Sequence, residues 1–466
     1  MEGAGDMFRY RDKSVKKRSS MPPNEVKEAL ERFLDDSKGT ELIRFLVRYW
    51  KDQQTVLTYR EIREAILAGD VTVQMMKDWQ QDYSKMVAKK LEPTWEAAME
   101  AGALNQMAHK GLDIGYKFRK DHWAVRNWLR DRTATMVTNC TDEQRKAIRN
   151  IIAEGIQNKM STRELEKFIR PCIGLTKPQA AANLRYYNNI KKELREKHPR
   201  MTEASIKKKA SEASMKYADR QLRQRAYTIA HTERAMAYEY GRYQHTKDLI
   251  AEGLLPLQKK TWSAARNEST CGRCLYLHGQ TVPIDDSFKE SDGKEIFLPP
   301  LHPLCRCVAM YQEDKLSREE ERAVIDYVGP NKSYVLNEKL RNGEELTKEE
   351  KEMRDNLDAA LRHFPTFEGR IMRVMNIDDD DLLKNFIDSL QGKNVSFPQY
   401  LSFSSKPGYN DDVANVIIYV DDSRKGRNML QYGKFEYEVL YERNTEFTLV
   451  NMQYSDGIWY ILLEEK

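Results

Sequence analysis

The pattern of apolar residues changes along the chain, and these changes exclude a single regular architecture. Apolar residues recur at helical spacing from about residue 22 to 255, and this spacing is lost between 256 and 310, where Gly, Pro, Cys and His concentrate. Helical spacing returns over 311–363, and short β-branched and aromatic segments follow from 367. Because 466 residues also exceed one ordinary core, the sequence predicts a multidomain protein.

The predicted fold has a mainly α-helical N-terminal region, a small Cys/His-rich module and a C-terminal α+β domain. We expect a disordered basic tail over 1–20, the helical region over 21–255, the Cys/His-rich module over 256–310 and the α+β domain over 311–466. Within the helical region, Thr141 with Gln144 and Ser161 with Glu164 are capping-box patterns that predict helix starts. No stretch approaches the roughly 18–20 apolar residues of a membrane span, so no membrane contact is expected.

Five residues that can bind a metal fall in two short groups. Cys271 and Cys274 form a C-x-x-C pair, and His302, Cys305 and Cys307 follow about thirty residues later. Two such groups bridged by a loop can close a tetrahedral zinc site, so the sequence predicts structural zinc. Five candidates for four positions leave the ligand set open. Reduced, buried thiols without a metal are the alternative.

The surroundings of these cysteines resemble a phage family. The runs TCGRCLYLHGQ and LPPLHPLCRC, with the upstream helix IAHTERAMAYEYGR, resemble the Mu F-like minor head proteins of tailed phages, also called the head morphogenesis family. The resemblance covers about residues 120–310, and His231 stands where the family is expected to have arginine. It implies a minor capsid protein near the portal, with portal and capsid proteins as partners and the virion as location.

Charge is unevenly distributed along the chain. The net charge is +5, although acidic residues outnumber basic ones after residue 320. The N-terminal part is therefore strongly basic, which fits contact with DNA or with an acidic protein. A solvated, lysine-rich helical surface explains the same charge, and the sequence does not choose between the two.

Three pieces of the C-terminal region carry side chains that suit one reaction. Arg373 lies in a predicted strand, and Ser402 and Ser404 flank a phenylalanine at a strand end. Glu436 and Glu438 are two residues apart, which in a strand puts both carboxylates on one face. Cleavage of the nicotinamide–ribose bond of NAD develops an oxocarbenium-like sugar. That reaction needs a carboxylate at the ribose, a cation for the diphosphate and a second carboxylate to orient an incoming arginine.

The order of these pieces resembles the R-S-E class of ADP-ribosyltransferases over about residues 321–466. The resemblance implies NAD as substrate, with Arg373 holding its phosphates and Ser402 and Ser404 in the NAD site. Ser402 would orient Glu438, and Glu438 would bond the ribose. Glu436 would position the acceptor, and glutamate there goes with arginine acceptors.

Further details follow from the same resemblance. The loop RKGRNMLQYGK would face the acceptor protein, with Tyr432 as a contact. Two residues depart from the family's pattern: Val374 follows Arg373 in place of a common glycine, and Phe403 replaces the threonine between the serines.

The predicted function is a phage minor capsid protein that carries a protein-arginine mono-ADP-ribosyltransferase. Its expected locations are the virion and the host cytoplasm, where a host or phage protein would accept the ADP-ribose. The head-like and transferase parts are expected to act as independent modules. Two alternatives remain: a structural head protein with an inactive, partner-binding C-terminal domain, and a polymorphic ADP-ribosylating toxin.

Overall fold

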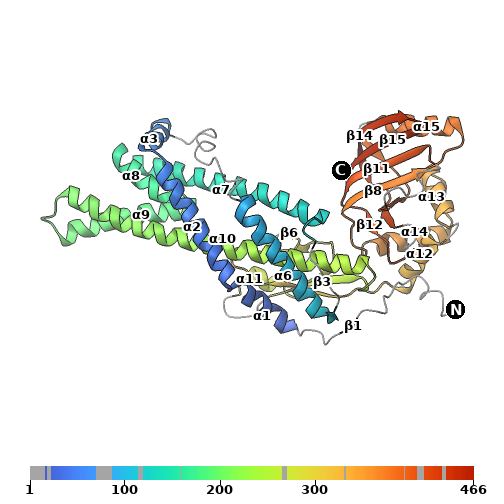
Figure 1. The fold of residues 1–466 in the computed structure, drawn as a ribbon, viewed down its shortest axis with the longest axis horizontal. Helices are drawn as coiled ribbons and strands as arrows, with labels where there is room; N and C mark the ends of the chain where they lie inside the picture. Colours follow the sequence, from blue (N-terminus) through green and yellow to red (C-terminus); the bar gives the residue numbers. More distant parts are fainter. Residues whose placement is uncertain are drawn as a thin grey trace.

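A computed structural model describes most of the chain. It covers residues 16–17, 23–69, 87–113, 119–158, 160–264, 270–329, 332–392, 394–406, 414–432 and 437–466. Figure 1 shows long helices at one end of the molecule and the C-terminal sheet with its helices at the other. Among the helices in these ranges, none is both long and apolar enough to cross a membrane.

The N-terminal region is built around one long helix. Its elements are α1 (Pro23–Leu34), α2 (Ser37–Val56), α3 (Tyr59–Ala68), the π-helical turn η1 (Val87–Leu91), α6 (Glu92–Lys110), α7 (Trp123–Gln157), α8 (Thr162–Cys172), α9 (Lys177–Lys197) and α10 (Glu203–Ala251). Two short strands, β1 (Lys16–Lys17) and β2 (Leu112–Asp113), pair with each other. The 49 residues of α10 run through the centre of this region, so most of its helices pack against one element.

Two glycines allow helices α6 and α10 to cross at a short distance. A Cβ on Gly102 of α6 would lie 2.0 Å from the carbonyl oxygen of Tyr238, and one on Gly241 of α10 would lie 2.1 Å from that of Met99. Only residues without a side chain allow backbones to approach this closely. Gly241 is the glycine of the IAHTERAMAYEYGR run, so this glycine has a packing role.

One of the two predicted helix starts is wrong. Ser161 accepts a hydrogen bond from the Glu164 amide and caps α8, as the capping box predicts. At Thr141 the helix does not start, because α7 continues from Trp123 to Gln157. Buried Leu129, Met136 and Ile148 keep one apolar face along α7 through this position, and continuous burial outweighs a local capping signal.

The Cys/His-rich module is a small sheet with loops. Its strands β4 (Thr281–Pro283), β3 (Gln258–Ser263) and β7 (Val308–Glu313) form an antiparallel sheet in that order, and β5 (Phe288–Lys289) pairs with β6 (Glu295–Ile296). A short helix, α11 (Gly272–Leu277), comes after β3 in the chain and has Cys271 as its N-cap. Because β3 and β7 pair along their whole length, the two ends of the module lie side by side.

The C-terminal domain has the predicted α+β fold. Helices α12 (Arg318–Val328), α13 (Lys332–Asn342) and α14 (Lys348–Leu361) precede the sheet, and α15 (Asp380–Leu390) interrupts it. The strands are β8 (Gly369–Met375), β9 (Asn394–Ser396), β10 (Leu401–Ser404), β11 (Val416–Ser423), β12 (Arg427–Asn428), β13 (Glu438–Tyr441), β14 (Glu446–Ser455) and β15 (Ile458–Glu465). Their order is β12-β13-β10-β8-β11-β15-β14-β9, with only β11 and β15 parallel among the pairs described.

One apolar core runs through both halves of the molecule. It includes Ile250 and Leu257 from the N-terminal part and Val324, Leu361 and Phe364 from the C-terminal domain. A second core lies within the C-terminal sheet. Because the first core crosses the junction, the C-terminal domain is packed on the rest of the chain. Whether the two parts act as independent modules stays a prediction.

Candidate functional site

Arg373 lies in the middle of β8 and reaches the neighbouring strand. Its side chain is half-buried, and its Nη1 donates a hydrogen bond of 2.6 Å to the Ser402 carbonyl oxygen in β10. Burial lowers the pKa of Arg373, and nearby Tyr327 and Glu438 oppose that shift. Arginine stays charged in proteins even so, so the site contains a fixed cation.

Glu438 is the buried carboxylate of the site. It begins β13, its residue is 5% exposed, and it lies opposite Ser404 in the antiparallel pair of β10 with β13. Ser402 lies opposite Leu440, so it is a diagonal neighbour of Glu438 on the same face. The register therefore brings both serines to the glutamate and places Ser404, rather than Ser402, directly across from it.

The two departures from the family's pattern are explained by the strands. Phe403 points to the opposite face from the serines, is 2% exposed and packs on Tyr441 with ring centroids 5.3 Å apart. Val374 pairs with Ile417 of β11, and its side chain alternates with that of Arg373 along β8. Phe403 thus fills the core of the sheet and does not occupy the site.

Glu436 lies outside the described residues. The expectation that it shares a strand face with Glu438 therefore stays a prediction. Among the described residues, β13 starts at Glu438, and Tyr437 before it has a left-handed φ of 51°. Tyr432 also differs from expectation: it is 7% exposed and packs on Phe364, with centroids 5.5 Å apart, so it does not face an acceptor.

The helices before the sheet contribute residues that the motif analysis did not assign. Tyr327 of α12 accepts a 3.0 Å hydrogen bond from the Asn337 side chain of α13, and the Asn337 Oδ1 accepts one of 3.2 Å from the Tyr400 amide. Burial and the Glu438 carboxylate both raise the pKa of the Tyr327 hydroxyl. Tyr327 and Asn337 lie in helical segments that resemble the family only in general pattern. The sequence therefore indicated no chemical role for either residue.

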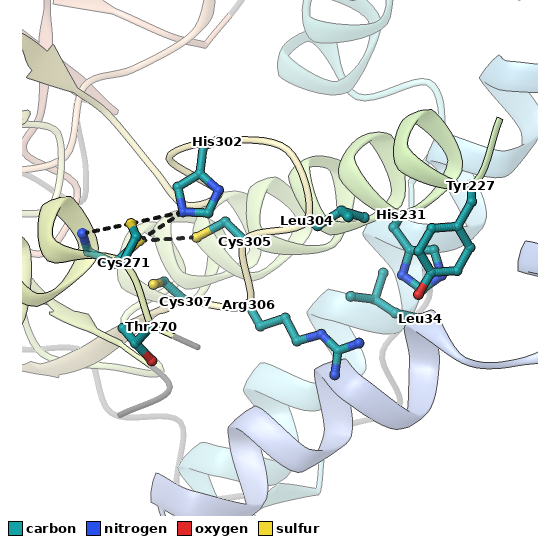
Figure 2. Close-up of a pocket in the computed structure, with 11 residues that line it drawn as sticks. Leu34, Tyr227, His231, Thr270, Cys271, His302, Leu304, Cys305, Arg306 and Cys307 are labelled. Atoms are coloured by element: carbon teal, nitrogen blue, oxygen red, sulfur yellow. Dashed lines mark hydrogen bonds between the residues drawn. The ribbon is translucent and has the colours of Figure 1, made fainter. Parts of the chain in front are cut away.

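The predicted metal ligands converge in the Cys/His-rich module. The His302 Nε2 lies 3.2 Å from the Cys271 sulfur and 3.3 Å from the Cys274 sulfur, and the Cys274 sulfur lies 3.6 Å from that of Cys305. Figure 2 shows this arrangement at the edge of a cavity of about 350 Å³. Cys274 belongs to two groups of three close donors, one with Cys271 and His302 and the other with Cys305 and Cys307.

The donor set fits a metal ion. The His302 Nδ1 lies 2.9 Å from the Pro303 carbonyl oxygen, a contact that requires the proton on Nδ1 and leaves the Nε2 lone pair toward the sulfurs. Hydrogen bonds from Cys307 and other neighbours lower the pKa of Cys305 to about 5, which favours a thiolate. Thiolates and imidazole within this distance of one another are the usual ligands of zinc.

Two other histidines, His278 and His231, lie near the cysteines but belong to neither group of close donors. His278 accepts a 3.1 Å hydrogen bond from the Ala264 amide at its Nδ1. His231, which replaces the expected arginine, is 5% exposed and stacks on Tyr227 with centroids 4.1 Å apart. Both lie within the folded structure, and His231 lines the cavity beside the cysteines (Figure 2).

Comparison with known proteins identifies two domains. A family model described as Phage Mu protein F like protein matches residues 145–310, and one described as ADP-ribosyltransferase exoenzyme matches residues 308–466. A curated relative is the NAD(+)–protein-arginine ADP-ribosyltransferase Tre1 of Serratia proteamaculans (strain 568), 28% identical over 150 residues. The match covers 32% of this chain and 32% of that relative, so it spans about a third of the relative's length.

Similar solved structures cover the same part of the chain. Exoenzyme S from Pseudomonas aeruginosa, in complex with human 14-3-3 protein beta and carba-NAD, is 24% identical and covers 32% of this chain and 74% of its own, with a TM-score of 0.28. The C3 exoenzyme of Clostridium limosum is 19% identical and covers 33% and 87%, also with a TM-score of 0.28. The chain therefore joins a Phage Mu F-like domain, at residues 145–310, to an ADP-ribosyltransferase exoenzyme domain, at residues 308–466.

Proposed function

We propose that the C-terminal domain transfers ADP-ribose from NAD to an arginine side chain of a protein. The observation that carries this proposal is the meeting of Arg373 and Glu438 across β8, β10 and β13, with Ser402 and Ser404 between them. The transferase family and the arginine-modifying relative support it.

In this reaction the C1′–N bond between ribose and nicotinamide breaks, and its electron pair leaves with nicotinamide. The pyridinium is already cationic, so its departure needs no general acid. Arg373 holds the diphosphate, because a guanidinium matches phosphate oxygens and stays charged. Glu438, held in a buried position opposite Ser404, stabilises the positive charge that develops on the ribose.

The second half of the reaction forms a new bond at C1′. A guanidinium nitrogen of the acceptor arginine attacks, and its proton passes to a carboxylate as the C–N bond forms. We assign this carboxylate to Glu436 on the strength of the family resemblance. Tyr327 and Asn337 connect α12 and α13 beside Glu438, and they act by holding the helices against the site.

The Mu F-like part gives the enzyme its proposed location. We infer that it is a minor capsid protein that contacts portal and capsid proteins, so that the transferase is carried in the virion and delivered to the host cytoplasm. The Cys/His-rich module binds one structural zinc through Cys271, Cys274, His302 and Cys305 or Cys307. A zinc ion held by these residues would cross-link α11 to the loop before β7 and would have no part in the transfer.

The test of the transferase proposal uses purified full-length protein with labelled NAD and host lysate. Wild-type protein is expected to label protein bands and release nicotinamide, and Glu438→Ala is expected to do neither. Labelling that equals wild type in Glu438→Ala would contradict the assigned site. A wild-type protein without nicotinamide release would support the inactive, partner-binding alternative.

A further inference from the structure

The positive charge of the Mu F-like part is concentrated on one helical arm. Helix α9 and the first part of α10 pack against each other, and the turn between them lies at the end of the molecule farthest from the C-terminal domain (Figure 1). Residues 177–223, which form this arm, contain thirteen Lys or Arg and five Asp or Glu. The net charge of the arm is therefore +8, compared with +5 for the whole chain. Such a surface attracts a polyanion.

Four of these cations form a row along α10. Lys209, Lys216, Arg220 and Arg223 are all exposed, and their spacing of seven, four and three residues puts them on one side of the helix. We call these four residues the basic face of α10. The opposite side of the helix is buried and includes Ala210, Ser214, Ala218 and Leu222. Because that side is packed, the helix holds the four cations along a line of about 21 Å, at a rise of about 1.5 Å per residue.

The basic face is not neutralised by its surroundings. Within the part of the chain that the structure describes, none of its four cations takes part in an ion pair. Two acidic residues lie between Lys209 and Arg223 in the sequence, Glu212 and Asp219. The Asp219 carboxylate already has a cation, because the Lys51 Nζ of α2 lies 3.1 Å from its Oδ2. The charges of the basic face are therefore available to an anion from outside the chain.

The chemistry of the basic face favours DNA over a protein as its partner. Between Lys209 and Arg223, this side of the helix otherwise carries Glu212 and Ala213, so it offers no large apolar side chain. Protein–protein interfaces depend on aromatic and apolar residues at their centre. Binding to the DNA backbone needs Lys and Arg, which neutralise phosphates and release counterions. Duplex DNA carries one negative charge per about 1.7 Å of its axis, so a row of this length can meet several phosphates at once.

We propose that the basic face of α10 binds the phosphate backbone of double-stranded DNA without reading its sequence. This inference assigns a ligand to the Mu F-like part and does not depend on the proposed transferase activity. It also chooses between the two partners, DNA and an acidic protein, that the charge of the N-terminal part leaves open.

The test measures binding of the full-length protein to a labelled, mixed-sequence duplex of about 30 base pairs over a series of salt concentrations. One variant combines Lys209→Gln with Lys216→Gln, and a second combines Lys209→Glu with Lys216→Glu. Both positions are exposed, so the substitutions leave the packed side of α10 unchanged. Lys348→Gln with Lys384→Gln, at exposed positions of α14 and α15, is the matched control, because it changes the total charge by the same amount as the first variant.

We expect wild-type protein to bind the duplex with an affinity that falls as salt rises. In the Lys209→Gln, Lys216→Gln variant the slope of log affinity against log salt should decrease by about 0.9 for each lost phosphate contact, and the affinity at about 50 mM salt should fall about ten-fold. The reversal of both charges to glutamate should weaken binding further, and the control should stay within about two-fold of wild type.

Three results would overturn the proposal. Wild-type protein that does not bind the duplex would do so, and so would equal losses of affinity in the Lys209→Gln, Lys216→Gln variant and the control. Poly-glutamate that competes as well as unlabelled duplex would show that the face accepts any polyanion, and an acidic protein would then be the favoured partner.

Discussion

The proposed function gives the two glutamates of the C-terminal site different tasks. Glu438 is buried on β13, and the serines of β10 lie between it and the Arg373 cation of β8, which fits its proposed contact with the charge that develops on the ribose. A buried carboxylate held on a strand suits electrostatic stabilisation. Glu436 has the acceptor task by the family resemblance alone.

We predict that substitutions at the two positions separate hydrolysis from transfer. Glu438→Ala should lose NAD hydrolysis and arginine transfer alike, by about 10²–10³ in rate, as for one well-placed transition-state contact. Glu436→Gln should lose transfer and keep much of the hydrolysis, because water does not need the acceptor carboxylate. The measurement is nicotinamide release with and without agmatine. Equal losses of the two activities in Glu436→Gln would contradict the division.

At the residue scale the sequence predicted which side chains come together. Arg373, Ser402, Ser404 and Glu438 lie on three adjacent strands, because strands keep the spacing of the motifs, and their roles stay a prediction. The left-handed Tyr437 was not foreseen, since nothing in a tyrosine signals a positive φ. The hydrogen bonds from the Gln431 side-chain amide to the Ile250 and Leu255 carbonyl oxygens were not foreseen either, because these partners lie some 180 residues earlier in the chain.

At the scale of the elements, the crossing of α6 and α10 leaves no space for an added side-chain atom at Gly241. A Cβ on Gly241 would lie within 2.1–2.6 Å of three backbone atoms of Met99, which cannot move aside as a side chain would. We predict that Gly241→Ala lowers the free energy of unfolding by about 1–3 kcal/mol or more, because the helices must separate. Gly392→Ala, whose nearest neighbour would be at 3.6 Å, is the control. Equal thermal midpoints for the two variants would contradict the prediction.

The Cys/His-rich module is the element whose stability should depend on a metal. Full-length protein purified without chelator is predicted to hold about one zinc per chain. Cys274→Ser should lose most of it, because Cys274 belongs to both groups of close donors. His278→Gln, which alters a histidine outside those groups, should keep it. Elemental analysis measures the zinc content of each protein. Wild-type protein without zinc would contradict the proposed site.

Local signals predicted these elements unevenly, for a physical reason. Ser161 begins a helix because the chain leaves α7 just before it, whereas Thr141 carries the same pattern within a helix that stays buried on one face. A capping box contributes about 1 kcal/mol, which is less than the burial of several apolar side chains. Several strands of the C-terminal sheet, such as β11, lie in the β-branched and aromatic segments expected from residue 367, because such runs are themselves the buried part of a sheet.

For the whole molecule, the packing between the two domains is the feature that the sequence does not indicate. The core from Ile250 and Leu257 to Leu361 and Phe364 is continuous, and Trp123 of α7 donates a 3.0 Å hydrogen bond to Asp422 of β11. A sequence pattern marks a residue as apolar, but it does not show which domain covers that residue. Two separable domains and two packed domains therefore have the same sequence pattern. In the packed arrangement, the Mu F-like part holds the transferase in one orientation.

A histidine at this junction predicts how the packing responds to pH. The His363 Nδ1, just after α14, lies 2.7 Å from the Asp314 carboxylate at the end of β7, and the Nε2 lies 3.8 Å from Glu320. The hydrogen bond with Asp314 is the main cause that raises the pKa of His363, and burial opposes it. Since the folded-state pKa is raised, the stabilisation is fully present below the unfolded pKa of about 6.5 and is lost as the pH rises through the folded value.

We therefore predict that His363→Gln destabilises the protein at low pH and not at high pH. Its thermal midpoint should lie below wild type at about pH 5.5, by an amount equivalent to on the order of 1 kcal/mol, and match wild type at about pH 8.5. Taking the difference at each pH removes the titrations that both proteins share. His198→Gln, at an exposed position after α9, should show no such change. A gap between His363→Gln and wild type that is the same at both pH values would mean that packing, and not the charge of His363, holds the domains at this point.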